Sequence, residues 1–95
     1  MDKIINIIQG DTVEMGIIDD TDLLAEAQFI CEDLKIYKDL VFSPDLKTWT
    51  LRLEKEETAQ LRAGVFQFKV VAVFKEGFKK TVIYGQKVNV LLKDY

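Results

Sequence analysis

Apolar and polar residues alternate along most of this chain, and that two-residue period is the pattern of half-buried β-strands. The clearest example is residues 48–53, where Trp49, Leu51 and Leu53 fall on one face and polar residues on the other. Similar runs bounded by turn-forming residues predict about seven strands, over residues 4–8, 12–18, 25–32, 34–42, 48–53, 65–75 and 79–92. Residues 54–61 are polar with a helical bias and early acidic residues, which predicts one short helical turn.

Residues 22–34 fit two interpretations. Asp22 could cap a helix, because Ala, Glu and Leu in this segment favour one. Helical spacing would scatter Phe29, Ile30 and Cys31 around the helix axis, whereas a strand places Phe29 and Cys31 on one face. We therefore favour a strand here.

The longest predicted strand, residues 65–75, has an apolar residue at every second position from Phe66 to Phe74. Glu76-Gly77 after it is a hairpin-turn signal, so residues 79–92 are expected to return alongside. The pattern of these last two strands, together with the closely spaced turn signals, predicts a single domain over residues 1–95. Its fold class is all-β, an immunoglobulin-like antiparallel sandwich.

The register of this hairpin has two solutions. A two-residue loop would pair Ala72 with Thr81, whereas a three-residue loop would pair Ala72 with Val82 and Val70 with Tyr84. We favour the second because it keeps alternate apolar residues of the last strand on one face: Val82, Tyr84, Val88, Val90 and Leu92. A bulge at Gly85 would reverse that parity.

The opposite side of the hairpin is also apolar at Val71, Val73 and Ile83, with Lys69 and Lys75 as the charges that interrupt it. A strand that is apolar on both faces is covered twice within its own domain or covered by a partner. We favour a partner and predict an interface formed by Lys69, Val71, Val73 and Ile83. The partner would be a second copy of the chain or another protein.

Charge and composition exclude several classes of partner. The net charge is −3, with 13 basic and 16 acidic residues interspersed, whereas phosphate binding needs a clustered basic face. We therefore expect no nucleic-acid partner. The apolar runs are too short to span a bilayer and no basic amphipathic helix is present, so no membrane role is expected. The single Cys31 forms no internal disulfide, which suits folding in a cytoplasm.

Candidate chemistry in the sequence is sparse. The chain has no His, the commonest general base and metal ligand, and Cys31 lies on an apolar face beside Phe29 as a small buried hydrophobe would. We therefore predict no enzyme, no catalytic residue, no cofactor and no metal ligand. The acidic loop 19–22 is interpreted as a solvated turn rather than a cation site, because it lacks the spacing and central Gly of a calcium loop.

A carbohydrate-binding module would need exposed aromatic residues for stacking on sugar rings. Trp49, Tyr37 and Tyr84 are the candidates for such a platform. Trp49 alternates with Leu51 and Leu53, which favours a place in the core. Small-ligand binding therefore stays the alternative to a protein-interaction function.

Three motifs carry a resemblance to a known family. They are Gln9-Gly10-Asp11-Thr12, the W-x-L-x-L of residues 49–53, and a third over residues 56–70 that runs from Glu56-Glu57-Thr58 through Gly64 to Val70. Together they resemble small β-sandwich modules of tailed-phage and prophage virion proteins, in particular the N-terminal module of upper baseplate proteins of phages that infect Gram-positive bacteria.

The resemblance implies a non-enzymatic role. Such modules attach a tail or baseplate component to its neighbours in a multi-copy shell, through self-association or contact with another virion protein. It also implies a location: the bacterial host cytoplasm during assembly, and then the virion.

Overall fold

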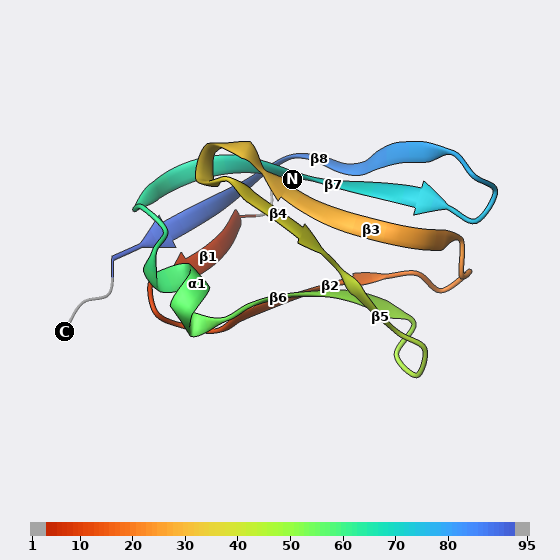
Figure 1. The fold of residues 1–95 in the computed structure, drawn as a ribbon, viewed down its shortest axis with the longest axis horizontal. Helices are drawn as coiled ribbons and strands as arrows, with labels where there is room; N and C mark the ends of the chain where they lie inside the picture. Colours follow the sequence, from red (N-terminus) through yellow and green to blue (C-terminus); the bar gives the residue numbers. More distant parts are fainter. Residues whose placement is uncertain (1–3, 93–95) are drawn as a thin grey trace.

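The structure, a computed structural model, describes residues 4–92, so residues 1–3 and 93–95 of the expected domain lie outside it. Two β-sheets pack face to face, and a short helix lies at one end between them (Figure 1). The strands are β1 (Ile4–Ile8), β2 (Val13–Ile18), β3 (Leu24–Cys31), β4 (Ile36–Asp39), β5 (Val41–Ser43), β6 (Thr48–Leu53), β7 (Gly64–Phe74) and β8 (Lys79–Leu91). The helical segments are a 3-10 turn, η1 (Glu32–Leu34), and the α-helix α1 (Lys55–Ala59).

The strand order confirms the predicted immunoglobulin-like sandwich. One sheet has the order β1-β8-β7-β3-β4 and the other β2-β6-β5. When β2, β3, β5, β6, β7 and β8 are taken as strands B, C, D, E, F and G, the sheets become B-E-D and G-F-C, with β4 added as C′. One detail differs from the expected antiparallel arrangement, because β1 pairs with β8 in parallel.

The predicted strand over residues 34–42 is wrong as a single element. It is divided between β4 in the five-stranded sheet and β5 in the three-stranded sheet. Leu40 lies between them, 5% exposed, and its N–H donates to the Ala27 carbonyl oxygen at 2.8 Å. The chain therefore crosses from one sheet to the other at Leu40 and closes that side of the sandwich.

The predicted strand over residues 25–32 is confirmed as β3, so the helical alternative is wrong. Its inward residues Ala27, Phe29 and Cys31 are at most 4% exposed. The Phe29 ring stacks on Phe68 of β7 with centroids 4.9 Å apart, because alternate residues of both strands point between the sheets. Burial raises the pKa of the Cys31 thiol, which keeps it in the protonated form of a structural residue.

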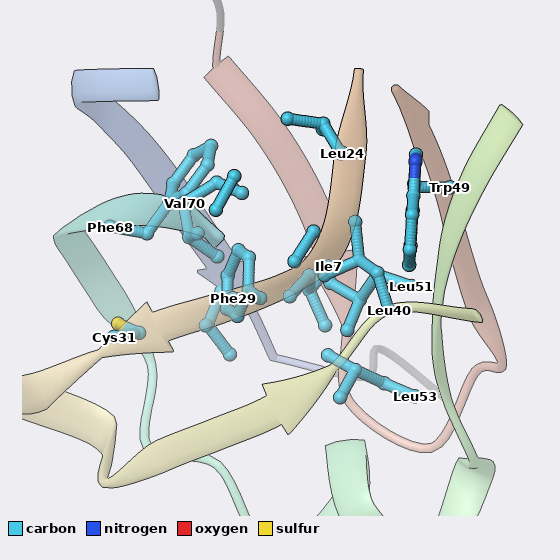
Figure 2. Packing of buried hydrophobic residues seen from close by; sticks show 14 residues of the cluster. Ile7, Leu24, Phe29, Cys31, Leu40, Trp49, Leu51, Leu53, Phe68 and Val70 are labelled. Atoms are coloured by element: carbon cyan, nitrogen blue, oxygen red, sulfur yellow. The ribbon is translucent and has the colours of Figure 1, made fainter. Parts of the chain in front are cut away.

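The core forms where the inward faces of the two sheets meet, and Figure 2 shows its side chains converging there. From β6, Trp49, Leu51 and Leu53 point inward as predicted and are at most 7% exposed. From β7, the alternate residues from Phe66 to Phe74 all pack against or within this core. Full burial of one such side chain contributes about 1.5–3 kcal/mol, so this alternation is the main source of stability.

The helix α1 closes the end of the sandwich near the β1–β2 loop. Its Thr58 is fully buried, and the Thr58 Oγ1 accepts the Gly10 N–H at 3.0 Å while donating to the Asp11 carbonyl oxygen at 2.7 Å. Gln9 Nε2 donates to the Leu61 carbonyl oxygen at 2.6 Å. Two of the three motifs that carry the phage resemblance thus contact each other, and these contacts fix the fold.

The first turn of α1 is capped by its own side chains. The Glu57 carboxylate accepts the Glu54 N–H at 3.0 Å, which satisfies a donor that the helix leaves free. Lys38 of β4 donates to the same carboxylate at 2.6 Å. The hydrogen bond from Lys38, followed by that from Glu54, lowers the pKa of Glu57.

Candidate interaction surface

The side of the five-stranded sheet that faces away from β2, β5 and β6 is covered by no helix or strand of the described part of the chain (Figure 1). We call this side the outer face. Its central strand is β7, where the predicted interface residues Lys69, Val71 and Val73 alternate with the buried residues Val70 and Ala72. The structure therefore places all three side chains on the outer face, as the alternation predicts.

Polar neighbours flank the two valines. Val71 is paired with Gln28 of β3 and Thr81 of β8, and Val73 with Glu26 and Lys79. Both valines are half-buried by these neighbours within the sheet. The outer face is therefore mixed in polarity, which is typical of interfaces between proteins that also exist separately.

Lys69 lies beside the acidic end of β3. Its Nζ is 3.6 Å from Glu32 Oε1, and its side chain stays 39% exposed. An ion pair at this exposure contributes at most about 1 kcal/mol to stability. The charge is thus held in place on the outer face but remains accessible to a partner.

The fourth predicted interface residue, Ile83, is wrongly placed by the sequence pattern. It is paired with Val70, whose side chain is fully buried, and it packs against the core. Paired residues of antiparallel strands point to the same side of a sheet. Ile83 therefore belongs to the inner face and does not join Val71 and Val73.

Ile83 is misplaced by the sequence pattern because the register of the β7–β8 hairpin is irregular. Its three-residue loop is closed by a hydrogen bond from Phe74 N–H to the Phe78 carbonyl oxygen, and Gly77 in the loop has φ 102°. This loop pairs Ala72 with Lys80, so the predicted pairs Ala72–Val82 and Val70–Tyr84 are both wrong. The register then shifts twice, between Phe68 and Val70 and between Val70 and Val71 of β7.

Each register shift leaves one extra residue on β8. The first lies between the pairs Val71–Thr81 and Val70–Ile83, and the second between Val70–Ile83 and Phe68–Gln86. At the second extra residue, Gly85 has φ 75°, a conformation that favours glycine. The bulge turns Tyr84 onto the outer face, where it is 82% exposed, although the sequence pattern placed it with the buried Val88. Tyr84 is thus a residue of this surface that alternation alone does not find.

Tyr84 forms one wall of a groove on the outer face. The groove encloses about 290 Å³ and is lined by Ile30, Glu32, Asp33, Gln67, Phe68, Lys69, Tyr84 and Gly85. Tyr37, 59% exposed, is paired with Ile30 on the next strand and extends the surface beyond the groove. The outer face therefore combines accessible tyrosines, an aliphatic residue and charges of both signs.

The acidic loop 19–22 is the predicted solvated turn at Asp20, Thr21 and Asp22, which are exposed, but the prediction is wrong for Asp19. Asp19 is 7% exposed, and its carboxylate accepts the N–H groups of Leu23 at 3.0 Å and Leu24 at 3.1 Å. The Trp49 indole N–H donates to the same carboxylate at 3.2 Å. Burial by itself raises the pKa of Asp19, but these hydrogen bonds and the charge of Lys75 outweigh it, and the pKa lies below its ordinary value.

These contacts also bear on the other candidate sites. Asp22 pairs with Lys75 at 2.6 Å, and within residues 4–92 no group of three or more His, Cys, Asp or Glu residues is arranged to hold a metal ion. Trp49 is 7% exposed and is therefore no stacking platform for a sugar. Tyr37 and Tyr84 are the accessible members of the predicted aromatic set.

Two further observations bear on what the chain is. Over the described residues, neither helical segment has the length and hydrophobicity that crossing a membrane requires. Comparisons of the chain with protein-family models, with curated proteins and with solved structures gave no match.

Proposed function

We propose that this protein is a non-enzymatic assembly module that binds a second copy of itself, or another virion protein, through the outer face of its five-stranded sheet. The observation that carries the proposal is the bulge at Gly85, which turns Tyr84 out of the core and onto that face. Bulges commonly re-aim a side chain in this way, and Tyr is among the residues enriched at interfaces and at their hot spots.

The size of the outer face suits a protein partner. Five strands about 4.8 Å apart, and 11 residues of β7 that each rise about 3.3 Å, give a surface of roughly 24 Å by 36 Å. That rectangle, roughly 860 Å², is an upper bound because β1 and β4 are shorter than β7, and it is close to the roughly 800 Å² that one partner buries in an interface of standard size. A small-molecule site would instead be a deep, mostly apolar cleft, whereas the groove beside Tyr84 is rimmed by Glu32, Asp33 and Lys69.

The setting we propose is a phage or prophage tail or baseplate, assembled in the cytoplasm of the bacterial host. It rests on the resemblance of three motifs. Two of these motifs have a structural role, because the hydrogen bond between Gly10 and Thr58 joins the β1–β2 loop to α1. The binding chemistry in this proposal comes from the outer face, with Lys69, Val71 and Val73 beside Tyr84.

Solution mass at high protein concentration tests the proposal. We expect the wild-type chain to exceed the mass of a monomer in light scattering, and the double variant Val71→Glu/Val73→Glu to return to the monomer mass, because two carboxylates are placed on the outer face. Val41→Glu is the matched control: Val41 is 71% exposed on the outward side of the three-stranded sheet. A strictly monomeric wild type, or unchanged assembly of a folded double variant, would contradict the proposal.

A carbohydrate- or small-ligand-binding function is the second candidate, and the exposure of Tyr84 beside a groove of about 290 Å³ favours it. Stacking of a sugar on an exposed tyrosine would give measurable heat in calorimetric titration with oligosaccharides. Tyr84→Ala should abolish that heat. Because Trp49 is buried against Asp19, its fluorescence would not report stacking directly.

A further inference from the structure

Half of one edge of β8 has no neighbouring strand among the described residues. β8 runs from Lys79 to Leu91, but β1 is only five residues long and pairs with Lys87–Leu91. Within residues 4–92, the segment 79–85 is therefore an open strand edge on the side away from β7. We call this segment the free edge.

The backbone groups on the free edge can be assigned from the hairpin. Phe74 and Phe78 form a hydrogen-bonded pair, with the Phe74 N–H donating to the Phe78 carbonyl oxygen at 2.8 Å. In an antiparallel ladder, bonded and non-bonded pairs alternate. The next residues of β8 that direct N–H and C=O away from β7 are consequently Lys79 and Thr81, paired with Val73 and Val71.

An apolar slot lies beside the free edge, between the two sheets. It encloses about 330 Å³, and its apolar lining is Ile5, Met15, Ile17, Phe68 and Ile83. The opposite side of the sandwich is closed where the chain crosses between sheets at Leu40. Among the described residues, the sandwich is thus open beside residues 79–85 of β8, which lie beyond the Ile4 end of β1, and there an added strand would find both unpaired backbone groups and an apolar recess.

The charge at the end of the free edge indicates which kind of strand fits. Lys79 and Lys80 are both exposed at the hairpin end of β8, on opposite faces of the sheet, and neither forms an ion pair with a described residue. Lysines on an edge repel a second copy of the same edge, so they disfavour pairing of two identical subunits here. They attract an acidic segment, which makes the edge selective for a partner of opposite charge.

We propose that the free edge of β8 accepts one extended strand from a different protein chain, which carries apolar side chains at alternate positions for the slot and acidic residues at the end that meets Lys79 and Lys80. Main-chain hydrogen bonds would supply affinity, and the slot and the lysines would supply specificity. The slot of this site lies between the sheets, whereas Lys79 and Thr81 of the free edge also flank Val73 and Val71 on the outer face.

The test uses two labelled peptides and fluorescence anisotropy. Glu-Glu-Val-Thr-Val-Thr-Val and Val-Thr-Val-Thr-Val-Glu-Glu present the acidic end in the two strand directions, and Lys versions of both serve as charge controls. We expect one acidic peptide to bind saturably and its Lys version to bind at least about tenfold more weakly, because the latter places like charges together.

Two variants at Thr81 test the role of the backbone. Thr81→Pro removes the N–H on the free edge without removing a bond to β7, so it should weaken binding by at least about tenfold. Thr81→Val keeps that N–H and should bind within about threefold of wild type. Circular dichroism checks that both variants are folded.

Several results would overturn the proposal: no binding of either acidic peptide to the wild-type chain, equal binding of the Lys peptides, or equal binding by folded Thr81→Pro. Tyr37→Glu separates this site from the proposed outer-face function. Tyr37 lies on β4, three strands away from β8, and this variant should leave peptide binding unchanged. A loss of binding in Tyr37→Glu would place the peptide on the outer face and refute the free-edge site.

Discussion

Replacing Asp19 by Asn exchanges one oxygen for an NH₂ group and leaves the volume of the side chain nearly unchanged. The carboxylate accepts three N–H groups, from Leu23 through Oδ1 and from Leu24 and the Trp49 indole through Oδ2. An Asn side chain has one acceptor oxygen. Its best orientation keeps that oxygen on Leu24 and Trp49 and turns the NH₂ group toward the Leu23 N–H, so that two donors face each other.

The magnitude follows from those three contacts. A hydrogen bond to a charged group contributes about 1.5–3 kcal/mol and a neutral one about 0.5–1.5 kcal/mol, so the two bonds that remain weaken by about 1 kcal/mol each. The unpaired Leu23 N–H costs about 1 kcal/mol more, because it is only partly buried and water can reach it. The sum is about 3 kcal/mol, and in a domain of this size that lowers Tm by roughly 12–24 °C.

The assay is thermal unfolding followed by circular dichroism, with Asp20→Asn as the matched control. Asp20 is the next residue and is exposed, so the same chemical change there should cost less than about 0.5 kcal/mol. If Asp19→Asn unfolds at the same temperature as Asp20→Asn, the carboxylate does not hold the Trp49 end of the sandwich together, and the argument from its three contacts is refuted.

Acid unfolding gives an independent check with a definite sign. The pKa of Asp19 is lower in the folded chain than its ordinary value of 3.8. A lowered pKa contributes stability that is fully present above the unfolded pKa and is lost as the pH falls through the folded pKa. Below about pH 4, wild type and Asp20→Asn should therefore lose stability more steeply than Asp19→Asn. Equal slopes would contradict this assignment.

Three further substitutions test single features of the fold, each by its free energy of unfolding in urea. Gly85→Ala should cost about 1–2 kcal/mol through φ alone, because an added Cβ meets no atom within 4 Å, and Gly85→Asn should cost less; equal costs would refute a conformational cause. Thr58→Val should cost about 1–3 kcal/mol by leaving the Gly10 N–H and the Asp11 carbonyl unpaired. A neutral result would show that these two hydrogen bonds do not hold α1 against the β1–β2 loop. Leu40→Ala should cost about 2–5 kcal/mol, whereas Leu46→Ala, 73% exposed, should be near neutral.

Alternation predicts most of the strands and their inward faces because it is a local property of the chain. The burial of Trp49, Leu51 and Leu53 could be predicted without knowing which strands they pack against. The same alternation hides the crossing at Leu40: Ile36, Leu40 and Phe42 all pack inward, so the pattern continues although the hydrogen-bonding partner changes. A strand that changes sheets while keeping its inward side leaves no mark in the hydrophobic pattern.

The surface residues were harder to predict for a different reason. The positions of Lys69, Val71 and Val73 could be predicted, because they alternate with the core residues of β7 and so lie on its opposite face. Tyr84 and Ile83 depend on two extra residues in β8, and in a run of adjacent apolar residues the sequence does not show where these are placed. Likewise, Asp19 becomes buried through Trp49, which lies 30 positions away in sequence.

The outer face and the free edge meet along β8, so the two proposals can be tested against each other. A strand added beside β8 would widen the five-stranded sheet by about 4.8 Å and would extend the outer face next to Tyr84. If the added strand and the outer-face contact come from one partner chain, Thr81→Pro and Tyr37→Glu weaken the same binding step.

Binding measured for Thr81→Pro, for Tyr37→Glu and for the double variant that combines them distinguishes one partner chain from two. Thr81 and Tyr37 lie on β8 and β4, with β7 and β3 between them, so they share no direct contact that would couple them. For separate partners, each single variant changes one binding constant and leaves the other within a factor of about two, the scatter expected of independent sites. For a shared partner, each variant lowers binding of that one chain, and the losses in free energy add. A partner that loses affinity for Thr81→Pro alone would assign the free edge to a chain of its own.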